Sequence, residues 1–153
     1  MTLGVLRPDQ IAAHDGLTLM RKVASGEIAQ SPYYRFLDAS LDAVGPGQAT
    51  VRAKPRPDYR NPLGSVHGGF IATLLDMCMG CAVHTRLAAR TTYATVEINL
   101  NYIRPVTCEL GELSAHGNVI HLGRNIGVIE GKLTSTAGKL LATGRSTVAI
   151  VRH

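Results

Sequence analysis

The sequence predicts an α+β fold in which one long helix packs against an antiparallel sheet. A helix-forming apolar run covers residues 67–87, and after it come about four segments with the period-two alternation of half-buried strands. Short turns join these segments without intervening helical patterns. Such connections are typical of an antiparallel sheet, because parallel strands need long crossovers.

Ahead of the long helix, the sequence predicts one further helix, a loop and one strand. Residues 8–25 form the predicted helix, because Pro8 and Asp9 suit its first turn and apolar residues follow at helical spacing. Residues 26–39 are predicted to be a loop whose aromatic side chains form a lid or a packing segment. In residues 48–55 apolar and polar residues alternate, which indicates a half-buried strand.

The segments after the long helix have predicted faces. In residues 93–105 the residues expected to share one face are Ala94, Val96, Ile98, Leu100 and Tyr102. In the later segments the shared faces are expected to carry Leu113, Ala115 and Val119, and then Leu140, Ala142, Val148 and Ile150. The same alternation predicts that Thr95 lies on the polar face of its strand, and that Pro105 ends this strand.

Composition indicates a globular protein with a modest positive charge. Of the 153 residues 45% are hydrophobic, and the formal net charge is +5. The basic residues are scattered and Trp is absent, so nucleic-acid binding is not expected. The three cysteines fit a reducing compartment, and no apolar run approaches the roughly 18 residues of a membrane span. We expect a cytoplasmic, single-domain protein without a membrane partner, in which residues 1–32 form an N-terminal helix and loop and residues 33–153 form the main domain.

Two adjacent glycines open the long helix. Residues 61–70 read NPLGSVHGGF and end with Gly68 and Gly69 just inside the predicted helix. Glycine lacks the Cβ that would keep a ligand away from the backbone, and the first N–H groups of a helix have no intrahelical partners. These groups suit a carbonyl oxygen that gains negative charge during acyl transfer. The alternative is that both glycines only serve a tight turn.

The long helix carries a single acid, Asp76, among apolar neighbours such as Leu75 and Met77. A buried carboxylate without a partner is strongly unfavourable, so some group must satisfy it or a cleft must open beside it. The alternative is a solvent-facing acid on an amphipathic helix. However, the residues one turn away on its side, which include Thr73 and Gly80, carry no charge. The pattern therefore favours a functional carboxylate.

The spacing of Gly68 and Asp76 predicts an oligomer if both residues act on one carbonyl group. They are eight residues apart, which corresponds to about 12 Å along a helix axis. Reacting atoms must approach to about 3–3.5 Å. Two copies with antiparallel helices, related by a two-fold axis, bring each acid opposite the glycine turn of the other copy. The protein would then be at least a dimer.

The chain resembles the hotdog-fold acyl-CoA thioesterases, specifically the phenylacetate-pathway (PaaI-like) branch. The resemblance rests on NPLGSVHGG with an acid nine residues after the histidine, on VEINLNYIRP, on GRN, and on the closing GKLLATGRST. It extends over nearly the whole chain from about Tyr33. That family wraps an antiparallel sheet around one central helix and hydrolyses thioesters at sites shared between two subunits. The resemblance implies a homo-oligomer, at least a dimer and in the family a tetramer, with acyl-CoA as the small-molecule partner.

The resemblance also implies catalytic roles. The Gly68 N–H would bind the thioester oxygen, and Asn61 would polarise the substrate or hold water. His67 would shape the turn and contact the thioester. Asp76 of the partner chain would be the nucleophile or the general base, and Thr95 would position water.

A second set of residues is implied to hold the substrate and its CoA arm. The residues are Gly69, Arg104, His121, Leu122, Gly123, Arg124, Asn125 and Arg145. The arginines would pair with phosphates, and Arg124 is the strongest candidate among them. The alternative for each arginine is an ordinary solvated side chain. No cofactor is expected, since the CoA thioester is itself the substrate.

Other signals are weaker. Cys78 and Cys81 fit a C-x-x-C pattern, but they lie inside the helix, whereas the redox motif opens a helix after a strand. The spacing of His67, Asp76 and His84 matches no metal-binding motif, so no metal is expected. Two rival functions stay open: a hotdog hydratase or dehydratase acting on acyl thioesters, and an acyl-CoA-binding protein without catalytic activity.

Overall fold

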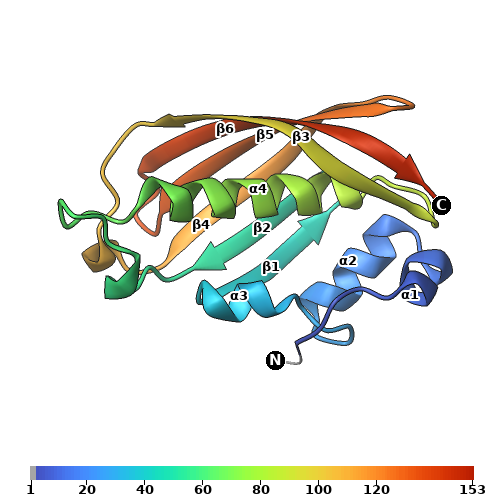
Figure 1. Ribbon diagram of the computed structural model, residues 1–153, viewed down its shortest axis with the longest axis horizontal. Coiled ribbons are helices and arrows are strands. Elements are labelled where there is room, and N and C mark those ends of the chain that lie inside the picture. The colour runs from blue at the N-terminus through green and yellow to red at the C-terminus, as the bar shows by residue number, and fades with distance from the viewer. Residues whose placement is uncertain (1–2) are drawn as a thin grey trace.

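The computed structural model describes residues 3–153 and shows an antiparallel sheet that wraps around one long helix (Figure 1). The strands are β1 (Ala39–Gly45), β2 (Gln48–Ala53), β3 (Thr91–Tyr102), β4 (Leu113–Leu122), β5 (Ile126–Ser135) and β6 (Leu140–Arg152). Their order in the sheet is β1-β2-β4-β5-β6-β3, and every neighbouring pair is antiparallel. The predicted α+β architecture is confirmed.

The long helix α4 (Gly68–His84) lies along the inner face of the sheet and carries much of the core. Leu74, Leu75 and Met79 are fully buried. The helix packs so closely on β4 that a Cβ at Gly117 would lie 2.3 Å from the carbonyl oxygen of Cys78. It ends at His84, three residues before the predicted end, because the chain turns there to start β3.

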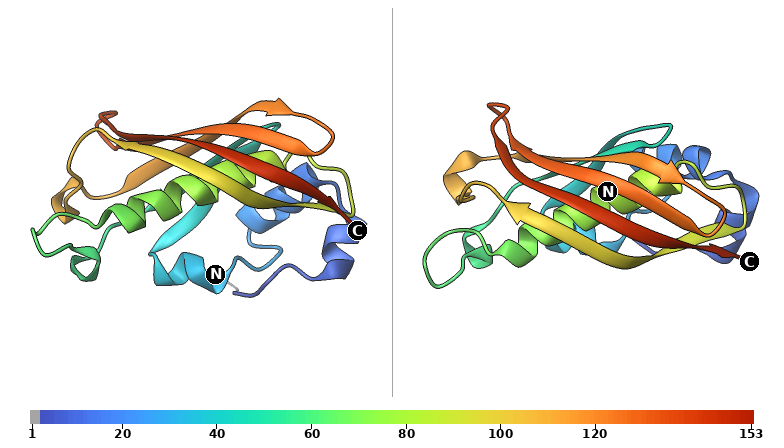
Figure 2. Two further views of the ribbon diagram at one scale, coloured as in Figure 1. Left: turned by 45° about the horizontal axis from the view of Figure 1, so that its top comes forward. Right: turned by 90° about the horizontal axis from the view of Figure 1, so that it is seen from above.

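Helices α1 (Pro8–Ala13), α2 (Gly16–Ala24) and α3 (Pro32–Phe36) form a cap on the side of α4 that faces away from β3 and β6 (Figure 2). Two short 3-10 helices, η1 (Pro57–Tyr59) and η2 (Cys108–Leu110), lie in the loops on either side of the α4–β3 unit. In the described residues 3–153, no helix is long and apolar enough to cross a membrane.

The single helix predicted for residues 8–25 is wrong, because the chain breaks into α1 and α2 at His14 and Asp15. The Asp15 side chain accepts the Thr18 N–H at 3.0 Å and so caps a new helix. Gly16 docks against the end of α4, where its N–H donates to the Leu87 carbonyl at 2.9 Å. A Cβ at Gly16 would lie 1.7 Å from the His84 carbonyl oxygen. The break is therefore fixed by a tertiary contact.

The loop predicted for residues 26–39 contains the short helix α3, and the strand β1 that follows it was not predicted. Ser31 caps α3, with its hydroxyl accepting the Tyr33 N–H at 3.4 Å. Strand β1 does not show a regular period-two pattern, because its register with β2 shifts between Leu41 and Ala43 and interrupts the alternation.

A bulge in β3 changes the predicted faces of that strand. The register with β6 shifts between Thr95 and Glu97, so one extra residue, Val96, lies in β3. Thr95 therefore lies opposite the buried Val148, on the face toward α4, while Val96 is 67% exposed. The prediction that Ala94 and Val96 share the inner face with Ile98 is wrong, as is the polar-face placement of Thr95.

A second bulge affects the start of β6. Ala142 lies opposite Leu133 in the core, but the next residue to pair is Leu140, opposite Thr134. The extra residue, Leu141, is buried. Leu140 is thus displaced from the face that it was predicted to share with Ala142, while the predictions for Leu113, Ala115, Val119 and Val148 agree with the observed burial and packing.

Candidate active site

The turn into α4 is organised by His67, which is the N-cap residue of the helix. Its ring Nδ1 accepts the Gly69 N–H at 3.1 Å, and its own N–H donates to the Tyr59 carbonyl at 2.7 Å. The imidazole thus satisfies one of the free donors at the helix start. His67 shapes the turn, as the family resemblance implied.

Gly68 is the first residue of α4, and within residues 3–153 no acceptor bonds its N–H. Its carbonyl accepts the Tyr102 hydroxyl at 3.1 Å. A Cβ at this position would lie 3.2 Å from the Tyr102 ring, so the glycine also makes room for that ring. The residue lines a cavity of about 350 Å³ that Tyr102 and Arg104 also line. A free N–H at a helix start beside a cavity can accept a carbonyl oxygen.

The Asn61 side chain is engaged within its own loop. Its Nδ2 donates to the Ser65 Oγ at 2.8 Å, and its Oδ1 accepts the Leu63 N–H at 2.9 Å. These bonds hold the turn ahead of α4. In one protomer the Asn61 side chain therefore supports this turn, through its Oδ1 and one of its two Nδ2 hydrogens.

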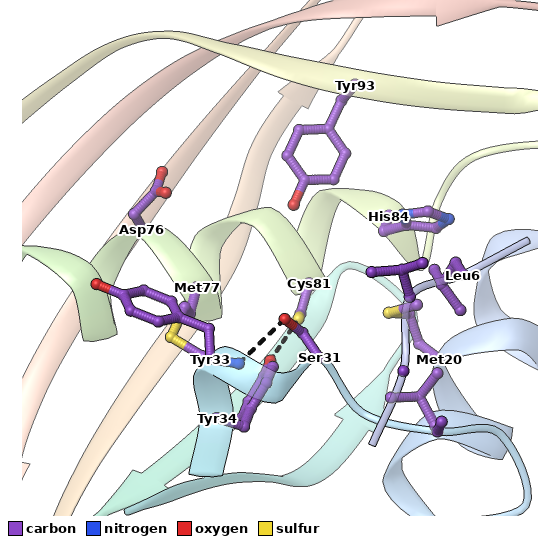
Figure 3. Close-up of a pocket in the computed structure, with 14 residues that line it drawn as sticks. Leu6, Met20, Ser31, Tyr33, Tyr34, Asp76, Met77, Cys81, His84 and Tyr93 are labelled. Atoms are coloured by element: carbon purple, nitrogen blue, oxygen red, sulfur yellow. Dashed lines mark hydrogen bonds between the residues drawn. The ribbon is translucent and has the colours of Figure 1, made fainter. Parts of the chain in front are cut away.

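Asp76 lies on α4 beside Thr95 of β3. The Thr95 hydroxyl donates to the Asp76 Oδ1 at 3.1 Å, a contact made by the β3 bulge. The carboxylate is half-buried and lines a cavity of about 390 Å³ under the cap (Figure 3). The sequence indicated that a partner or a cleft must accompany this acid, and both are present.

Gly68 and Asp76 face different cavities in one protomer. Two turns of α4 separate them, so a single copy does not bring the helix-start N–H and the carboxylate together. Gly69 and His67 line a third cavity, of about 360 Å³, next to Tyr33. Tyr33 also lines the Asp76 cavity, so the Gly69 cavity and the Asp76 cavity share this side chain.

The residues implied to hold the CoA arm are spread over the molecule. Arg104 lies near the start of α4, where its Nη1 donates to the Leu140 carbonyl at 2.6 Å. The hairpin formed by residues 121–125 joins β4 and β5 near the opposite end, where the Arg124 carbonyl accepts from Arg152 and the Asn125 carbonyl accepts the Ile150 N–H at 2.9 Å. Arg145 is exposed on β6 opposite Glu130. One protomer does not gather these three arginines at one site.

The cavity beside Asp76 has polar residues that sequence reasoning did not assign to the site. The Tyr34 hydroxyl lies 3.4 Å from the Cys81 Sγ, and Tyr93 meets His84 edge-on with ring centroids 5.9 Å apart. Burial raises the pKa values of both tyrosines and of Cys81, and it lowers the pKa of His84 to about 4. At neutral pH these four side chains are therefore neutral hydrogen-bonding groups.

One signal for these residues was present in the sequence. Asp76, Gly80 and His84 recur every four residues, which places them on one face of a helix.

The cysteines of the C-x-x-C pattern are free thiols: the Cys78 Sγ bonds to the Leu75 carbonyl at 3.2 Å. Within residues 3–153, no group of three or more His, Cys, Asp or Glu is arranged to hold a metal ion.

An antiparallel sheet wrapped around one long helix is the hotdog fold that the family resemblance implied. The family model for the thioesterase superfamily matches residues 63–142. The chain belongs to the thioesterase superfamily and is a thioester hydrolase. The predicted family, fold and enzyme class are thus confirmed.

Individual relatives carry related names. Human acyl-coenzyme A thioesterase 13 is 33% identical over 71% of this chain and 76% of its own length. The 1,4-dihydroxy-2-naphthoyl-CoA hydrolase of Listeria monocytogenes is 27% identical over 71% of this chain and 86% of its own length. Among solved structures, a mutant of the phenylacetic acid degradation protein PaaI from Thermus thermophilus is similar, with 27% identity, a TM-score of 0.71, and coverage of 78% of this chain and 98% of that protein.

Proposed function

We propose that the protein hydrolyses acyl-CoA to a free acid and CoA at sites shared by two copies of the chain. In each site the Gly68 N–H of one copy binds the thioester oxygen, and Asp76 of the other copy drives the attack. The observation that carries the proposal is the position of Asp76. Its carboxylate accepts the Thr95 hydroxyl, lines a cavity, and lies two helical turns from the free N–H at the start of the same helix. The names of the relatives support CoA thioesters as the substrate class.

The dimer is proposed to form through β3. Within residues 3–153 this twelve-residue strand lies at the edge of the sheet and pairs only with β6, which leaves a row of free backbone groups along its other side. Strand β3 runs alongside α4, with Tyr102 at the start of the helix and Tyr93 near its end. Antiparallel pairing of two β3 strands therefore makes the two α4 helices antiparallel as well.

The β3 bulge sets the register of this proposed pairing. Residues that pair across two strands must face the same side of the sheet. With Val96 counted as the extra residue, a two-fold axis at Asn99 pairs Ile98 with Leu100 and Thr95 with Tyr102. All of these pairs then share a face. Since Thr95 contacts Asp76 and Tyr102 contacts Gly68, this register brings the acid of one copy to the helix start of the other.

The chemistry follows from these positions. Either Asp76 attacks the thioester carbon, or it removes a proton from water that attacks; both routes stay open. In both, the carbonyl oxygen becomes negative beside the Gly68 N–H, where the helix dipole adds a favourable field. When water attacks, its oxygen joins the acyl carbon, the C–S bond breaks, and the proton taken by Asp76 passes to the CoA sulfur. When Asp76 attacks, the C–S bond breaks to leave a mixed anhydride between the acyl group and Asp76; water then hydrolyses this anhydride, which frees the acid, regenerates the carboxylate and supplies the proton for the CoA sulfur. The Thr95 hydroxyl holds the Asp76 carboxylate in place through its 3.1 Å bond.

The phosphate contacts of CoA are proposed to come from the arginines. Arg104 lines the same cavity as Gly68, beside the proposed oxyanion site. Arg124 lies at the opposite end of the folded protomer from Gly68, so it would reach the same substrate only from the second copy.

The test of the shared site is complementation between two inactive variants. Asp76→Asn removes the charge, and we expect kcat to fall at least about a hundredfold in thiol-release assays over a panel of acyl-CoAs. Gly68→Pro removes the N–H, and proline is tolerated at the first helical position. His67 already has the extended conformation that proline requires of the residue before it. A mixed dimer of the two variants holds one intact site, so random assembly restores about a quarter of the wild-type activity.

The matched control for Gly68→Pro is Gly68→Ala, which adds the same Cβ beside Tyr102 but keeps the N–H. Because the N–H remains and the added Cβ is common to both variants, Gly68→Ala should lose less activity than Gly68→Pro. Asp58→Asn, an exposed acid in η1, controls for loss of charge. No recovery in the mixed dimers would reject a shared site. Hydration of crotonyl-CoA without thiol release, or binding without either reaction, would support one of the rival functions.

A further inference from the structure

The cavity beside Asp76 continues along α4 beneath the cap. Its walls come from the N-terminal segment, from α2, α3 and α4, and from β3, and its residues include Leu6, Met20, Tyr34, Met77, His84 and Tyr93 (Figure 3). The cap residues precede the stretch 63–142 that the thioesterase family model matches. With a volume of about 390 Å³, the cavity falls within the roughly 300–1,000 Å³ typical of small-molecule sites.

His84, far along this cavity from Asp76, lines the cavity with an imidazole that no other protein group engages. His84 as a whole is only 8% exposed. Within residues 3–153, neither of its ring nitrogens has a hydrogen-bond partner. Within the described residues, Arg56 Nε is the one fully buried side-chain nitrogen or oxygen without a partner, so the ring nitrogens of His84 are accessible from the cavity and can bind a polar group there. A neutral imidazole offers one donor and one acceptor, which is what a hydroxyl group matches.

Tyr93 adds a second polar atom to this part of the cavity. Its hydroxyl lies above Gly80, where a Cβ would be only 2.1 Å from the hydroxyl oxygen. Within residues 3–153 this hydroxyl has no hydrogen-bond partner, whereas the Tyr34 hydroxyl is already engaged with Cys81. Gly80 thus makes room for a tyrosine hydroxyl between Asp76 and His84.

The distance between the two ends sets the length of the ligand. Asp76 and His84 are eight residues apart on α4, which is about 12 Å. Because each bond of an extended carbon chain advances it by somewhat less than the bond length of about 1.5 Å, a chain of roughly eight to ten atoms spans this distance. Leu6, Met20 and Met77 supply apolar contacts along the way.

We propose that this cavity binds the acyl group of the substrate, and that His84 and Tyr93 select acyl groups of medium length that carry a hydroxyl at the far end. The inference rests on the proposed function, because the thioester carbon must lie at Asp76. It assigns specificity to residues of this chain, with the cap as one wall of the acyl pocket. His84 and Tyr93 contact the substrate far from the reacting bond, so they act on substrate choice.

The test compares two thioesters that differ by one oxygen, octanoyl-CoA and 8-hydroxyoctanoyl-CoA. With the wild-type protein, kcat/KM measured by thiol release should be about tenfold higher for the hydroxylated ester, as expected for one or two hydrogen bonds. His84→Phe should lower the ratio of the two esters towards one, because the hydroxyl loses its partner at residue 84. Tyr93→Phe removes a single oxygen and should lower the ratio part of the way, which covers the case in which the histidine variant does not fold. His153→Phe, at the exposed C-terminus, is the matched control and should leave the ratio unchanged.

Two results would overturn the inference, and they differ. A wild-type ratio near one with brisk hydrolysis of octanoyl-CoA would reject the distal hydroxyl site while the proposed function stands. Release of thiol from neither ester nor from any other acyl-CoA would reject the proposed function and this inference together.

Discussion

The buried His84 makes the stability of the protein depend on pH in a predictable way. Burial lowers the pKa of this imidazole from 6.5 to about 4, because the charged form loses its solvation and the side chain gains no compensating partner. Below pH 6.5 the unfolded chain takes up a proton at this position more readily than the folded chain. His84 therefore leaves the folded state unpenalised above pH 6.5 and destabilises it progressively as the pH falls towards 4.

The size of this effect follows from the shift. A change from 6.5 to about 4 corresponds to about 3 kcal/mol at 1.36 kcal/mol per pKa unit, and it is expected to develop between pH 7 and pH 4. His84→Gln removes the titrating group. The wild-type protein should therefore lose about 3 kcal/mol more than the variant over this range.

Urea unfolding at fixed protein concentration, at pH 7 and pH 4, measures this difference. The wild-type protein and His84→Gln are compared with His153→Gln, which removes an exposed histidine and should follow the wild-type curve. Parallel losses of stability in the wild-type protein and in His84→Gln would show that His84 is protonated in the folded state without penalty. The account of a neutral, buried imidazole would then be wrong.

Three further predictions test the packing, the dimer and the site. Gly117→Ala places a Cβ 2.3 Å from the Cys78 carbonyl oxygen and should lower the free energy of unfolding by about 3 kcal/mol or more. Gly45→Ala, where a Cβ meets open space, should change the free energy of unfolding little. Equal urea midpoints for the two variants would refute the close packing of α4 on β4. Asn99→Cys should form a disulfide-linked dimer on mild oxidation, and Thr136→Cys should not; crosslinking of both or neither on non-reducing gels contradicts the β3 pairing. Thr95→Val should lower kcat about tenfold by freeing Asp76 from its hydroxyl partner, and an unchanged kcat would remove Thr95 from the site.

The regular spacing of apolar residues along each segment made most of the fold predictable. The apolar run of α4 and the alternation of the strands after it depend on local residue order, so a single sequence reveals them. The errors have a common cause. The bulges in β1, β3 and β6 each add one residue to a strand, and each reverses which residues face the core beyond that point. Where a bulge falls depends on how the strand pairs with its neighbour, so the alternation of a single sequence does not locate it.

The split between α1 and α2 is another case. Pro8 and the helical spacing predicted one continuous helix, because residues 8–13 and 16–24 both favour a helix locally. The break at Asp15 exists because Gly16 must fit against the end of α4, more than sixty residues later in the chain. Such a contact depends on the assembled fold and has no local pattern.

The sequence by itself determined the α+β class, the helix that starts at His67 and Gly68, and the unusual acid Asp76, because helix caps, glycine pairs and lone charges are local chemical features. Only the tertiary structure decided that Thr95 bonds this acid and that Tyr93 and His84 lie along the cavity beside it. These contacts join residues from separate elements whose spacing in the sequence does not encode their distance. The bulge in β3, formed by pairing with β6, turned Thr95 toward α4.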